Sequence, residues 1–310
     1  MTHRPPFLVD TDTASDDAVA LIMALREPAI DVRAITVVAG NVPLELGVQN
    51  ALYVRELCGS EVSVHAGASR PALRPLETAQ FVHGQDGMGD IGLPLAGREP
   101  SREGAVDAIL RVSRESAGEL NLVTLGPLTN VAAALERDPT LAQRVVRCVI
   151  MGGAADGVGN VTPVSEYNFW VDPEAAARVF DSGLPITMVG WDISRKYAVI
   201  PPDLAAALRG LGSSAARVAI DIQGIVDRFA RKVGLAGFDL PDPIAMAVAL
   251  YPEVATRVVR HRVEIETGDG LCRGQSIVDH FGVLGRASNA DVVVEASHKA
   301  FVRRLRAALA

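Results

Sequence analysis

The amino-acid sequence predicts an α/β fold in which helices flank a mainly parallel, open sheet. Short apolar, β-rich runs alternate with helical segments along almost the whole chain, and this order is typical of parallel sheets with helices on both faces. Of the 310 residues, 49% are hydrophobic and 22% are charged, as in ordinary globular proteins. Length alone allows one or two domains. Because no linker, composition break or internal repeat divides the chain, we expect residues 1–310 to form a single domain.

The expected strands are short runs rich in valine, isoleucine and leucine. Continuous apolar character of this kind is typical of strands that are buried on both faces of a sheet. In chain order they are residues 7–10, 32–38, 62–65, 120–125, 145–151, 185–189, 258–265 and 292–296. In such sheets ligands bind outside the carboxyl ends of the strands, so polar residues that follow a strand are the first candidates for a site.

The segments between these strands carry small and apolar residues in patterns typical of helices. The expected helices are residues 16–25, 44–57, 105–116, 128–136, 173–180 and 300–309, and residues 202–233 are expected to be mostly helical. Residues 66–100 differ, because they show little periodicity and hold many glycines and prolines. A long irregular segment of this kind predicts a functional loop.

Charge and composition exclude several classes of partner. With 30 Lys and Arg against 37 Asp and Glu, the net charge is −7, which argues against a nucleic-acid-binding surface. The longest notable apolar run, residues 18–25, is too short to span a bilayer, and residues 1–12 carry no signal-peptide pattern. Cys58, Cys148 and Cys272 form no Cys-x-x-Cys pair and are expected to be reduced thiols. We therefore expect a cytoplasmic protein with no membrane or nucleic-acid partner.

The segment after the first expected strand concentrates acidic side chains. Asp10, Asp12, Asp16 and Asp17 fall within eight residues, and no lysine or arginine lies among residues 6–24. Helix capping and the helix dipole account for Asp16 and Asp17. They do not account for Asp10 and Asp12, which lie at the end of the strand. A hard cation with oxygen ligands accounts for all four.

Two known kinds of cation-dependent enzyme carry similar runs. The stretch around Asp10 and Asp12 resembles the signature of haloacid dehalogenase-type phosphatases, with a nucleophilic first aspartate, an acid/base second aspartate and Mg²⁺. That alternative needs a well-placed lysine, and the chain has only Lys196, Lys232 and Lys299. The whole acidic run instead resembles the Asp-x-Asp-x-x-x-Asp-Asp motif of the inosine-uridine type nucleoside hydrolases.

Later segments match the nucleoside hydrolase pattern in the same order, over about residues 7–280. They are Ala39–Asn41, the His-Gly-x-x-Gly-Met-Gly loop His83–Gly89, the strand-to-helix turn Leu125–Asn130, Met151–Gly153 followed by Asn160, the Asp-Pro-Glu-Ala box Glu166–Ala175, and Asp242–Ala245. On these motifs the chain is identified as a member of this family. The resemblance implies a Rossmann-like nucleoside hydrolase fold and hydrolysis of the N-glycosidic bond of ribonucleosides, which releases ribose and a free base.

The resemblance also implies a Ca²⁺ cofactor. Asp12, Asp17 and Asp242 would be its carboxylate ligands, and Leu125 would contribute its backbone carbonyl. Asp12 would in addition be catalytic, as the general base that activates the metal-bound water, and Asp10 would support the ligands from behind. An ion held by oxygen ligands can orient a water molecule and grip the ribose diol.

The remaining implied residues bind the nucleoside substrate. The resemblance assigns this role to Asp16, Asn41, Met151, Asn160, Glu166 and Asn168. It also implies a homodimer or homotetramer, for which no feature of the sequence itself argues.

The chain departs from the family pattern at one important position. Many members have a histidine immediately before the late ligand aspartate, where it can protonate the leaving base, and this chain has Pro241. Proline has no group that donates a proton. His83 is therefore the catalytic alternative that we expect, and Asp227 and Arg231 are weaker candidates.

Three questions stay open at this point. Trp170 and Trp191 suggest stacking on the base, although core or rim positions are more typical of tryptophan. The substitution at Pro241 keeps open a Ca²⁺- and nucleoside-binding homologue with weak catalysis. The preferred base is not predicted, beyond a shift towards substrates with better leaving groups.

Overall fold

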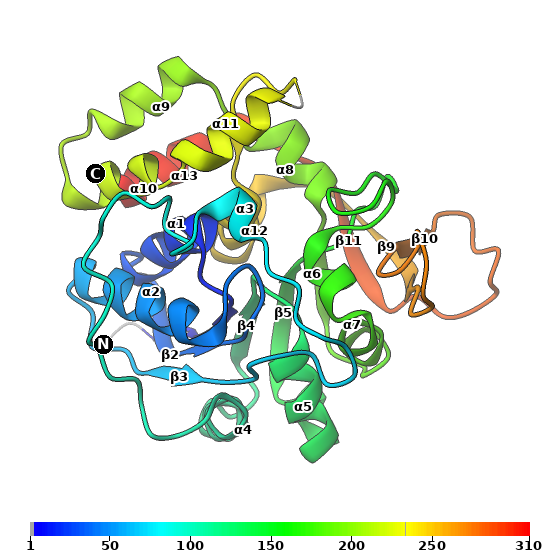
Figure 1. Ribbon diagram of the computed structural model, residues 1–310. Coiled ribbons are helices and arrows are strands. Elements are labelled where there is room, and N and C mark those ends of the chain that lie inside the picture. Colours follow the sequence, from blue (N-terminus) through cyan, green and yellow to red (C-terminus); the bar gives the residue numbers. More distant parts are fainter. Residues whose placement is uncertain (1–2, 233) are drawn as a thin grey trace.

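The strands of the protein form one large sheet. In a computed structural model that describes residues 3–232 and 234–310, nine strands are hydrogen-bonded side by side (Figure 1). Every neighbouring pair from β3 to β11 is parallel, whereas β9 and β10 add antiparallel strands at one edge. The predicted α/β fold with a mainly parallel sheet is therefore confirmed. That residues 1–310 form a single domain stays a prediction, and residues 1, 2 and 233 lie outside the described part.

The strand order places the first strand near the middle of the sheet. From one edge to the other, the strands are β10 (Ser276–Asp279), β9 (Ala255–Ile265), β11 (Ala290–Ala296), β6 (Ile186–Val189), β5 (Val145–Met151), β4 (Leu120–Thr124), β1 (Pro6–Thr11), β2 (Asp31–Val37) and β3 (Val64–Ala66). A separate two-stranded sheet pairs β7 (Val199–Ile200) with β8 (Phe238–Asp239).

Helices cover both faces of the large sheet (Figure 1). They are α1 (Ser15–Leu25), α2 (Leu44–Leu57), α3 (Gln80–His83), α4 (Ala105–Glu115), α5 (Thr129–Arg137), α6 (Tyr167–Val171), α7 (Pro173–Phe180), α8 (Trp191–Tyr197), α9 (Pro202–Arg209), α10 (Ser214–Asp221), α11 (Gly224–Lys232), α12 (Pro241–Leu250) and α13 (His298–Leu309), with 3₁₀ turns at Pro139–Gln143 and Pro252–Val254.

Two apolar clusters bury the two faces of the sheet. Successive residues of a strand point to opposite faces, so Val9 of β1 joins α1, α2, α12 and α13, whereas Leu8 joins α4, α5 and α7. Helices α1 and α12 pack against each other and are buried on nearly all sides. Their first turns consequently lie at the centre of the molecule.

Some elements differ from the sequence-based expectation. The strand predicted at 258–265 is the longer β9, which runs antiparallel to its neighbours. Residues 202–233 divide into three helices, with residue 233 outside the described part, and residues 66–100 contain the short helix α3. The prediction missed α12, because a helix that is apolar on all sides shows no amphipathic period. It also missed the short elements α6, α8 and β10, which offer few residues for a periodic pattern.

Beside β1, successive strands of the sheet change the side on which they are added. From β1 the chain moves to β2 and β3 on one side, and from β4 to β5 and β6 on the other. At such a switch point the loops leave in opposite directions and open a crevice at the carboxyl ends of the strands. The backbone N–H of Leu125, just past β4, donates to the carbonyl of Asp10 at 2.8 Å. This crevice therefore holds the residues that the sequence singled out.

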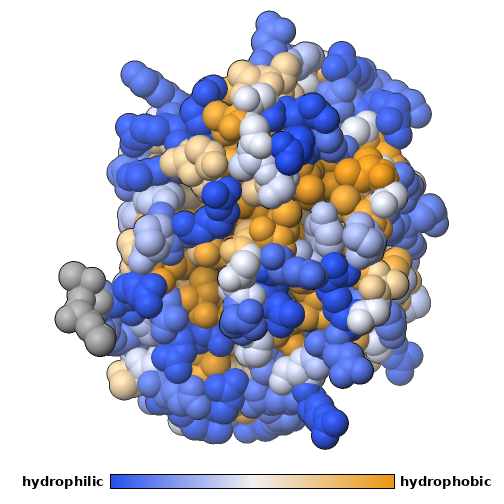
Figure 2. Space-filling model, turned by 90° about the vertical axis from the view of Figure 1, so that its left-hand side faces the viewer, coloured by the Kyte–Doolittle hydropathy of each residue, from blue (hydrophilic) through white to orange (hydrophobic). Residues whose placement is uncertain are grey.

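One face of the molecule combines polar and apolar side chains. In Figure 2 hydrophilic residues dominate the outline of this face, and apolar residues form a broken band across its middle. Within the described residues, no helix combines the length and the apolar character that crossing a membrane requires.

Candidate active site

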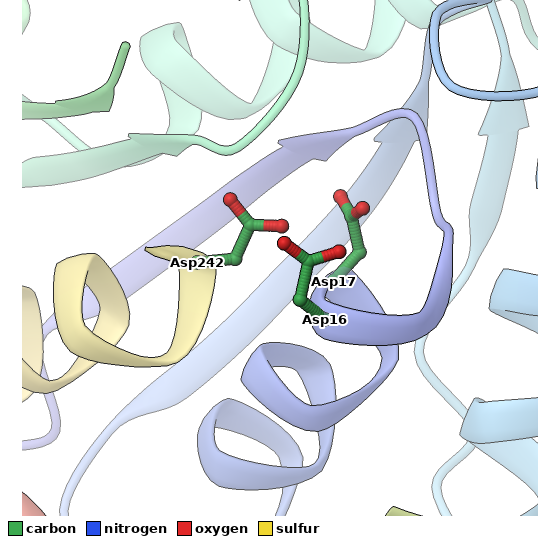
Figure 3. Close-up of side chains that lie close together, drawn as sticks. All are labelled: Asp16, Asp17 and Asp242. Carbon is green, nitrogen blue, oxygen red and sulfur yellow. The ribbon is translucent and has the colours of Figure 1, made fainter. Parts of the chain in front are cut away.

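Three aspartates from two helices converge at the crevice. Asp16 and Asp17 lie in the first turn of α1, and Asp242 lies in the first turn of α12. Their carboxylates point toward one another (Figure 3), each offers an oxygen within 4.8 Å of the others, and all three residues are buried. Both helices direct the positive ends of their dipoles at this point, which favours negative charge there.

Asp12 lies in a space that two glycines keep open. Its Oδ2 accepts a hydrogen bond from the backbone N–H of Asn41 at 2.6 Å, and its buried Oδ1 has no hydrogen-bond partner among the described residues. A Cβ atom at Gly40 would lie 2.1 Å from Oδ2, and one at Gly126 would lie 2.8 Å from Oδ1. Glycine after β2 and after β4 is thus needed to seat the Asp12 carboxylate.

Asp10 lies beneath this carboxylate and ties three elements together. Its Oδ1 accepts hydrogen bonds from the hydroxyl of Thr36 on β2 and from Nδ2 of Asn130 on α5, the latter at 2.9 Å. Asn130 also donates to the carbonyl of Val37 at 3.1 Å. These contacts suit the predicted supporting role of Asp10, which stays a prediction.

Burial makes the acidic cluster electrostatically unfavourable when it has no counter-charge. It raises the pKa of Asp10 to about 7 and the pKa of Asp16 and of Asp17 to about 6. The pKa values of Asp12 and Asp242 rise well above the ordinary range, first by burial and then by repulsion from Asp17. Within residues 3–232 and 234–310, no lysine or arginine forms an ion pair with these carboxylates. A bound cation is the charge that would compensate them.

His83 lies beside the acidic cluster. It ends α3, is buried, and lies with its Nδ1 2.8 Å from Oγ of Ser15 and 3.7 Å from Oδ1 of Asp16. Burial lowers the pKa of His83 to about 4, so the ring is neutral near pH 7. Its predicted catalytic role as a proton donor stays a prediction.

Two of the residues expected to bind ribose, Glu166 and Asn168, are held by bonds to the loops after β4 and β5. Glu166 caps α6 and is buried, with Oε2 accepting from the N–H of Gly153 at 2.8 Å. Asn168 is also buried, and its Nδ2 donates to the carbonyl of Leu125 at 2.8 Å and to that of Met151 at 3.3 Å. The predicted metal-ligand carbonyl at Leu125 is thereby held in place, and it retains a second lone pair.

Asn41 and Asn160 differ from each other in burial. Asn41 is buried beside Asp12 and uses its backbone N–H in the bond described above. Asn160 is exposed, and its Oδ1 accepts from the backbone N–H of Tyr167 at 2.9 Å. The Asn160 contact is a loop-forming one, and binding of ribose by Asn160 stays a prediction.

These features agree with comparisons to known proteins. The family model for inosine-uridine preferring nucleoside hydrolases matches residues 7–303. The chain belongs to this family. It is 37% identical over 300 residues to the pyrimidine-specific ribonucleoside hydrolase RihA of Escherichia coli strain E24377A, a match that covers 96% of each sequence.

Solved nucleoside hydrolase structures share the fold. A plant nucleoside hydrolase, PpNRh1, superposes with a TM-score of 0.92 at 31% identity and covers 99% of both chains. A purine-preferring ribonucleoside hydrolase from Gardnerella vaginalis has a TM-score of 0.90 at 30% identity, over 98% of this chain and 99% of that one. Membership of the nucleoside hydrolase family makes the protein an N-ribosyl hydrolase and favours this activity over the phosphatase alternative.

The weaker candidates for contact with the base lie on helices α6, α11 and α12 of this nucleoside hydrolase. Pro241 is the first residue of α12, and Arg231 on α11 pairs with Asp227 at 2.8 Å. The guanidinium of Arg273 lies over the Trp170 ring at 4.2 Å from its centroid.

The sequence analysis missed several side chains that hold the site. Ser15 contacts His83, while Thr36 and Asn130 hold Asp10. Asn130 was visible in the Leu125–Asn130 motif, but its role depends on a contact across 120 positions of the chain.

Proposed function

We propose that this nucleoside hydrolase cleaves the N-glycosidic bond of ribonucleosides with the help of Ca²⁺ held by Asp12, Asp17, Asp242 and the Leu125 carbonyl. The observation that carries the proposal is the convergence of buried carboxylates with no lysine or arginine paired to them within the described residues. Asp12 supports it further, because its Oδ1 is buried without a partner in a space that two glycines keep open.

The donor set fits a hard cation. Every candidate ligand is an oxygen, and Ca²⁺ accepts such ligands in variable number and geometry, whereas Mg²⁺ demands a near-ideal octahedron. Asp16 lies in the same cluster but is not one of the proposed ligands. Its carboxylate is therefore available to bind the substrate. When bound, the ion supplies the positive charge that orients water and the ribose diol.

The chain's own residues would carry the proton and the sugar. Asp12 accepts the proton of the attacking water, and the N–H of Asn41 fixes the orientation of its carboxylate. Asp16, Asn41, Asn160, Glu166 and Asn168 bind the ribose hydroxyls, and Met151 packs beside Asn168. Hydrogen bonds that strengthen as the sugar gains oxocarbenium character lower the barrier.

Departure of the base requires a hydrogen-bond donor other than the histidine that many family members have at the position of Pro241. The hydroxyl of Ser15 lies 2.8 Å from Nδ1 of His83, and in the tautomer in which Ser15 donates this bond the neutral ring carries its proton on Nε2. In this proposal His83 adopts that tautomer and donates a hydrogen bond to the leaving base from Nε2, in place of a side chain at Pro241. A second function, weak catalysis in a Ca²⁺- and nucleoside-binding homologue, is favoured only by Pro241. We further propose a cytoplasmic homodimer or homotetramer.

The decisive experiment measures free ribose after the purified protein meets a panel of nucleosides and nitrophenyl riboside. We expect release of ribose that stops when the metal is chelated and returns with calcium. Asp242→Ala should abolish turnover, while Asp203→Ala, an exposed aspartate in the first turn of α9, serves as the matched control. Binding of nucleosides without ribose release would support the homologue with weak catalysis instead.

A further inference from the structure

A buried asparagine in the middle of α2 has no part in the mechanism described above. Asn50 is completely buried, although asparagine is a poor helix former and a buried amide is costly unless its polar atoms are hydrogen-bonded. Its Oδ1 has no hydrogen-bond partner among the described residues. A leucine would fill a similar space without an unsatisfied acceptor of its own. The N–H donors of Asn50, rather than its shape, therefore distinguish it from an apolar residue at this position.

The amide of Asn50 joins two segments that lie far apart in the sequence. Its Nδ2 donates to the carbonyl of Thr13 at 3.0 Å and to the carbonyl of Asp86 at 2.9 Å. Because both partners are backbone acceptors, only the N–H₂ group of the amide fits between them. The first carbonyl belongs to the acidic turn, residues 12–14, and the second to the glycine-rich loop, residues 84–90. One buried side chain thus holds the turn and the loop together.

The bond to Asp86 reaches His83 through a closely hydrogen-bonded loop. The Asp86 carboxylate accepts from the backbone N–H of Met88 at 2.6 Å. The N–H of Gly89 donates to the carbonyl of His83 at 2.9 Å. Met88 is completely buried in the apolar cluster that includes α1 and α2. The backbone of His83 is therefore tied to that of Asp86, and through Asn50 to the acidic turn.

The glycine-rich loop approaches α2 so closely that one of its positions requires glycine. A Cβ atom at Gly87 would lie 2.7 Å from Cγ1 of Val42 and 3.0 Å from Nδ2 of Asn50. The φ of Gly87 is 76°, which glycine adopts without steric cost. Glycine at this position allows the close contact in which Asn50 bonds to the loop.

The ring of His83 meets the residue that directly follows the acidic turn. Its Nδ1 lies 2.8 Å from Oγ of Ser15, the first residue of α1. Ser15 lies two positions after Thr13, whose carbonyl accepts one of the two bonds from Asn50. The bonds of Asn50 thus set the separation across which the His83 ring contacts α1.

We propose that Asn50 is a positioning residue for departure of the base, because its two bonds hold Nε2 of His83 where donation to the base requires it. The inference rests on the proposed role of His83 and adds a residue of α2 to it. A general acid contributes about 10²–10⁴-fold only when its heavy atom lies within roughly 2.6–3.2 Å of its partner. Loss of the bonds from Asn50 therefore costs part of this contribution.

The test compares substrates whose leaving groups differ in their need for a proton. Asn50→Leu keeps the branching at Cγ and removes both donors. Nitrophenolate leaves without protonation, so kcat/KM for nitrophenyl riboside should fall by no more than about twofold. For the nucleosides that wild type cleaves, kcat/KM should fall by at least about tenfold, a part of the contribution of a general acid. Equal losses with both kinds of substrate overturn the proposal, because damage to the ribose or metal site lowers both.

A double-mutant cycle tests whether Asn50 acts through His83. In a His83→Ala background, Asn50→Leu should lower nucleoside hydrolysis by less than about twofold, since residues that act as one unit are not additive. A tenfold loss that persists without the imidazole overturns the proposal. Asn121→Leu is the matched control, because Nδ2 of Asn121 on β4 also donates to two backbone carbonyls, those of Pro6 and Glu119. It should change the ratio of the two substrates by less than twofold.

A second variant keeps the test decisive if Asn50→Leu does not fold. Asp86→Ala removes the carboxylate that organises the glycine-rich loop and leaves Asn50 and the acidic turn in place. It should lower nucleoside hydrolysis more than nitrophenyl riboside hydrolysis, by a smaller factor than Asn50→Leu. Equal losses with both substrates in Asp86→Ala would overturn the proposal.

The outcomes also separate this inference from the proposed function. Failure of wild type to cleave any riboside refutes the proposed function itself. If His83→Ala cleaves nucleosides as fast as wild type, the proposed donor is refuted, and the role of Asn50 with it. If His83→Ala is impaired but Asn50→Leu lowers hydrolysis of both kinds of substrate equally, only the role of Asn50 is refuted.

Discussion

Around Asp12, at the carboxyl ends of β1 and β4, the acidic side chains lie in the core, whereas the rim formed by α3 and α11 presents exposed aromatic rings. Asp12, Asp10 and Asp17 are completely buried. On the rim, Phe81 is 72% exposed and Phe229 is 37% exposed, and they contact each other edge to face. The proposed ribose side of the site thus lies in the core, whereas the rim, which we propose as the base side, consists of residues with few constraints.

This difference agrees with what the relatives are called. A pyrimidine-specific hydrolase and a purine-preferring hydrolase both resemble this chain over almost its whole length. A core that fixes the sugar and the cation can be kept while the rim varies, because surface positions tolerate substitution with little loss of stability. The predictions below probe the two sides in order of decreasing effect.

The largest effect is expected at Asp12. In Asp12→Ala both the proposed general base and a proposed metal ligand are lost, so kcat should fall by more than the roughly 10²–10⁴-fold typical of a general base alone. Ribose release and calcium content, measured by elemental analysis, check this outcome. Near-normal turnover in Asp12→Ala would end the proposed mechanism.

Gly40→Ala should be almost as damaging, although it removes no functional group. The added Cβ would lie 2.1 Å from Oδ2 of Asp12, so the carboxylate must move away from the N–H of Asn41. We expect at least a tenfold loss of kcat/KM with a nearly unchanged circular dichroism spectrum. Gly104→Ala is the control for a Gly-to-Ala exchange, because Gly104 has an ordinary φ of −73° and the nearest atom to an added Cβ there would be 3.9 Å away. Equal activity of Gly40→Ala and wild type would contradict the tight seating of Asp12.

Asp10→Asn should weaken the site without destroying it. The side chain contacts Thr36 and Asn130 and forms no part of the converging carboxylate group. Loss of a residue that supports metal ligands typically costs roughly 10–100-fold in metal affinity. The metal affinity is measured by titrating the metal-free protein with calcium and using ribose release as the readout. A loss as complete as that of Asp12→Ala would make Asp10 a ligand itself.

Stability should depend on pH through Glu166. Burial raises its pKa to about 7, above the usual 4.5, so its contribution to stability is complete below pH 4.5 and is lost as the pH rises through 7. The loss amounts to about 3 kcal/mol. With equal metal content, the fall in Tm between pH 5 and pH 8 should be smaller in Glu166→Gln than in wild type. Parallel Tm curves for the two proteins would show that Glu166 does not titrate in this range.

The sequence alone indicated the acidic part of the candidate site, because the run that contains Asp16 and Asp17 is a local pattern. Asp242 was grouped with Asp12 and Asp17 only through the family resemblance. The structure brings Asp242 beside Asp16 and Asp17, and the ligand set itself stays a prediction. Contacts such as Asn130 with Asp10 join segments far apart in the chain, and no local pattern signals them.

The smallest effect is expected from truncating the rim, in Phe81→Ala. An exposed side chain contributes little to folding, and an edge-to-face contact at an exposed site is worth about 0.5 kcal/mol, so Tm should change by no more than a few degrees. Metal content should stay at the wild-type level, because Phe81 contacts no carboxylate of the cluster. If the rim borders the base, KM should change by different factors for different nucleosides, while Phe281→Ala, 93% exposed in the loop after β10, changes none of them. Loss of calcium or of the fold in Phe81→Ala would show that the rim and the ribose side are coupled, and the contrast between them would no longer hold.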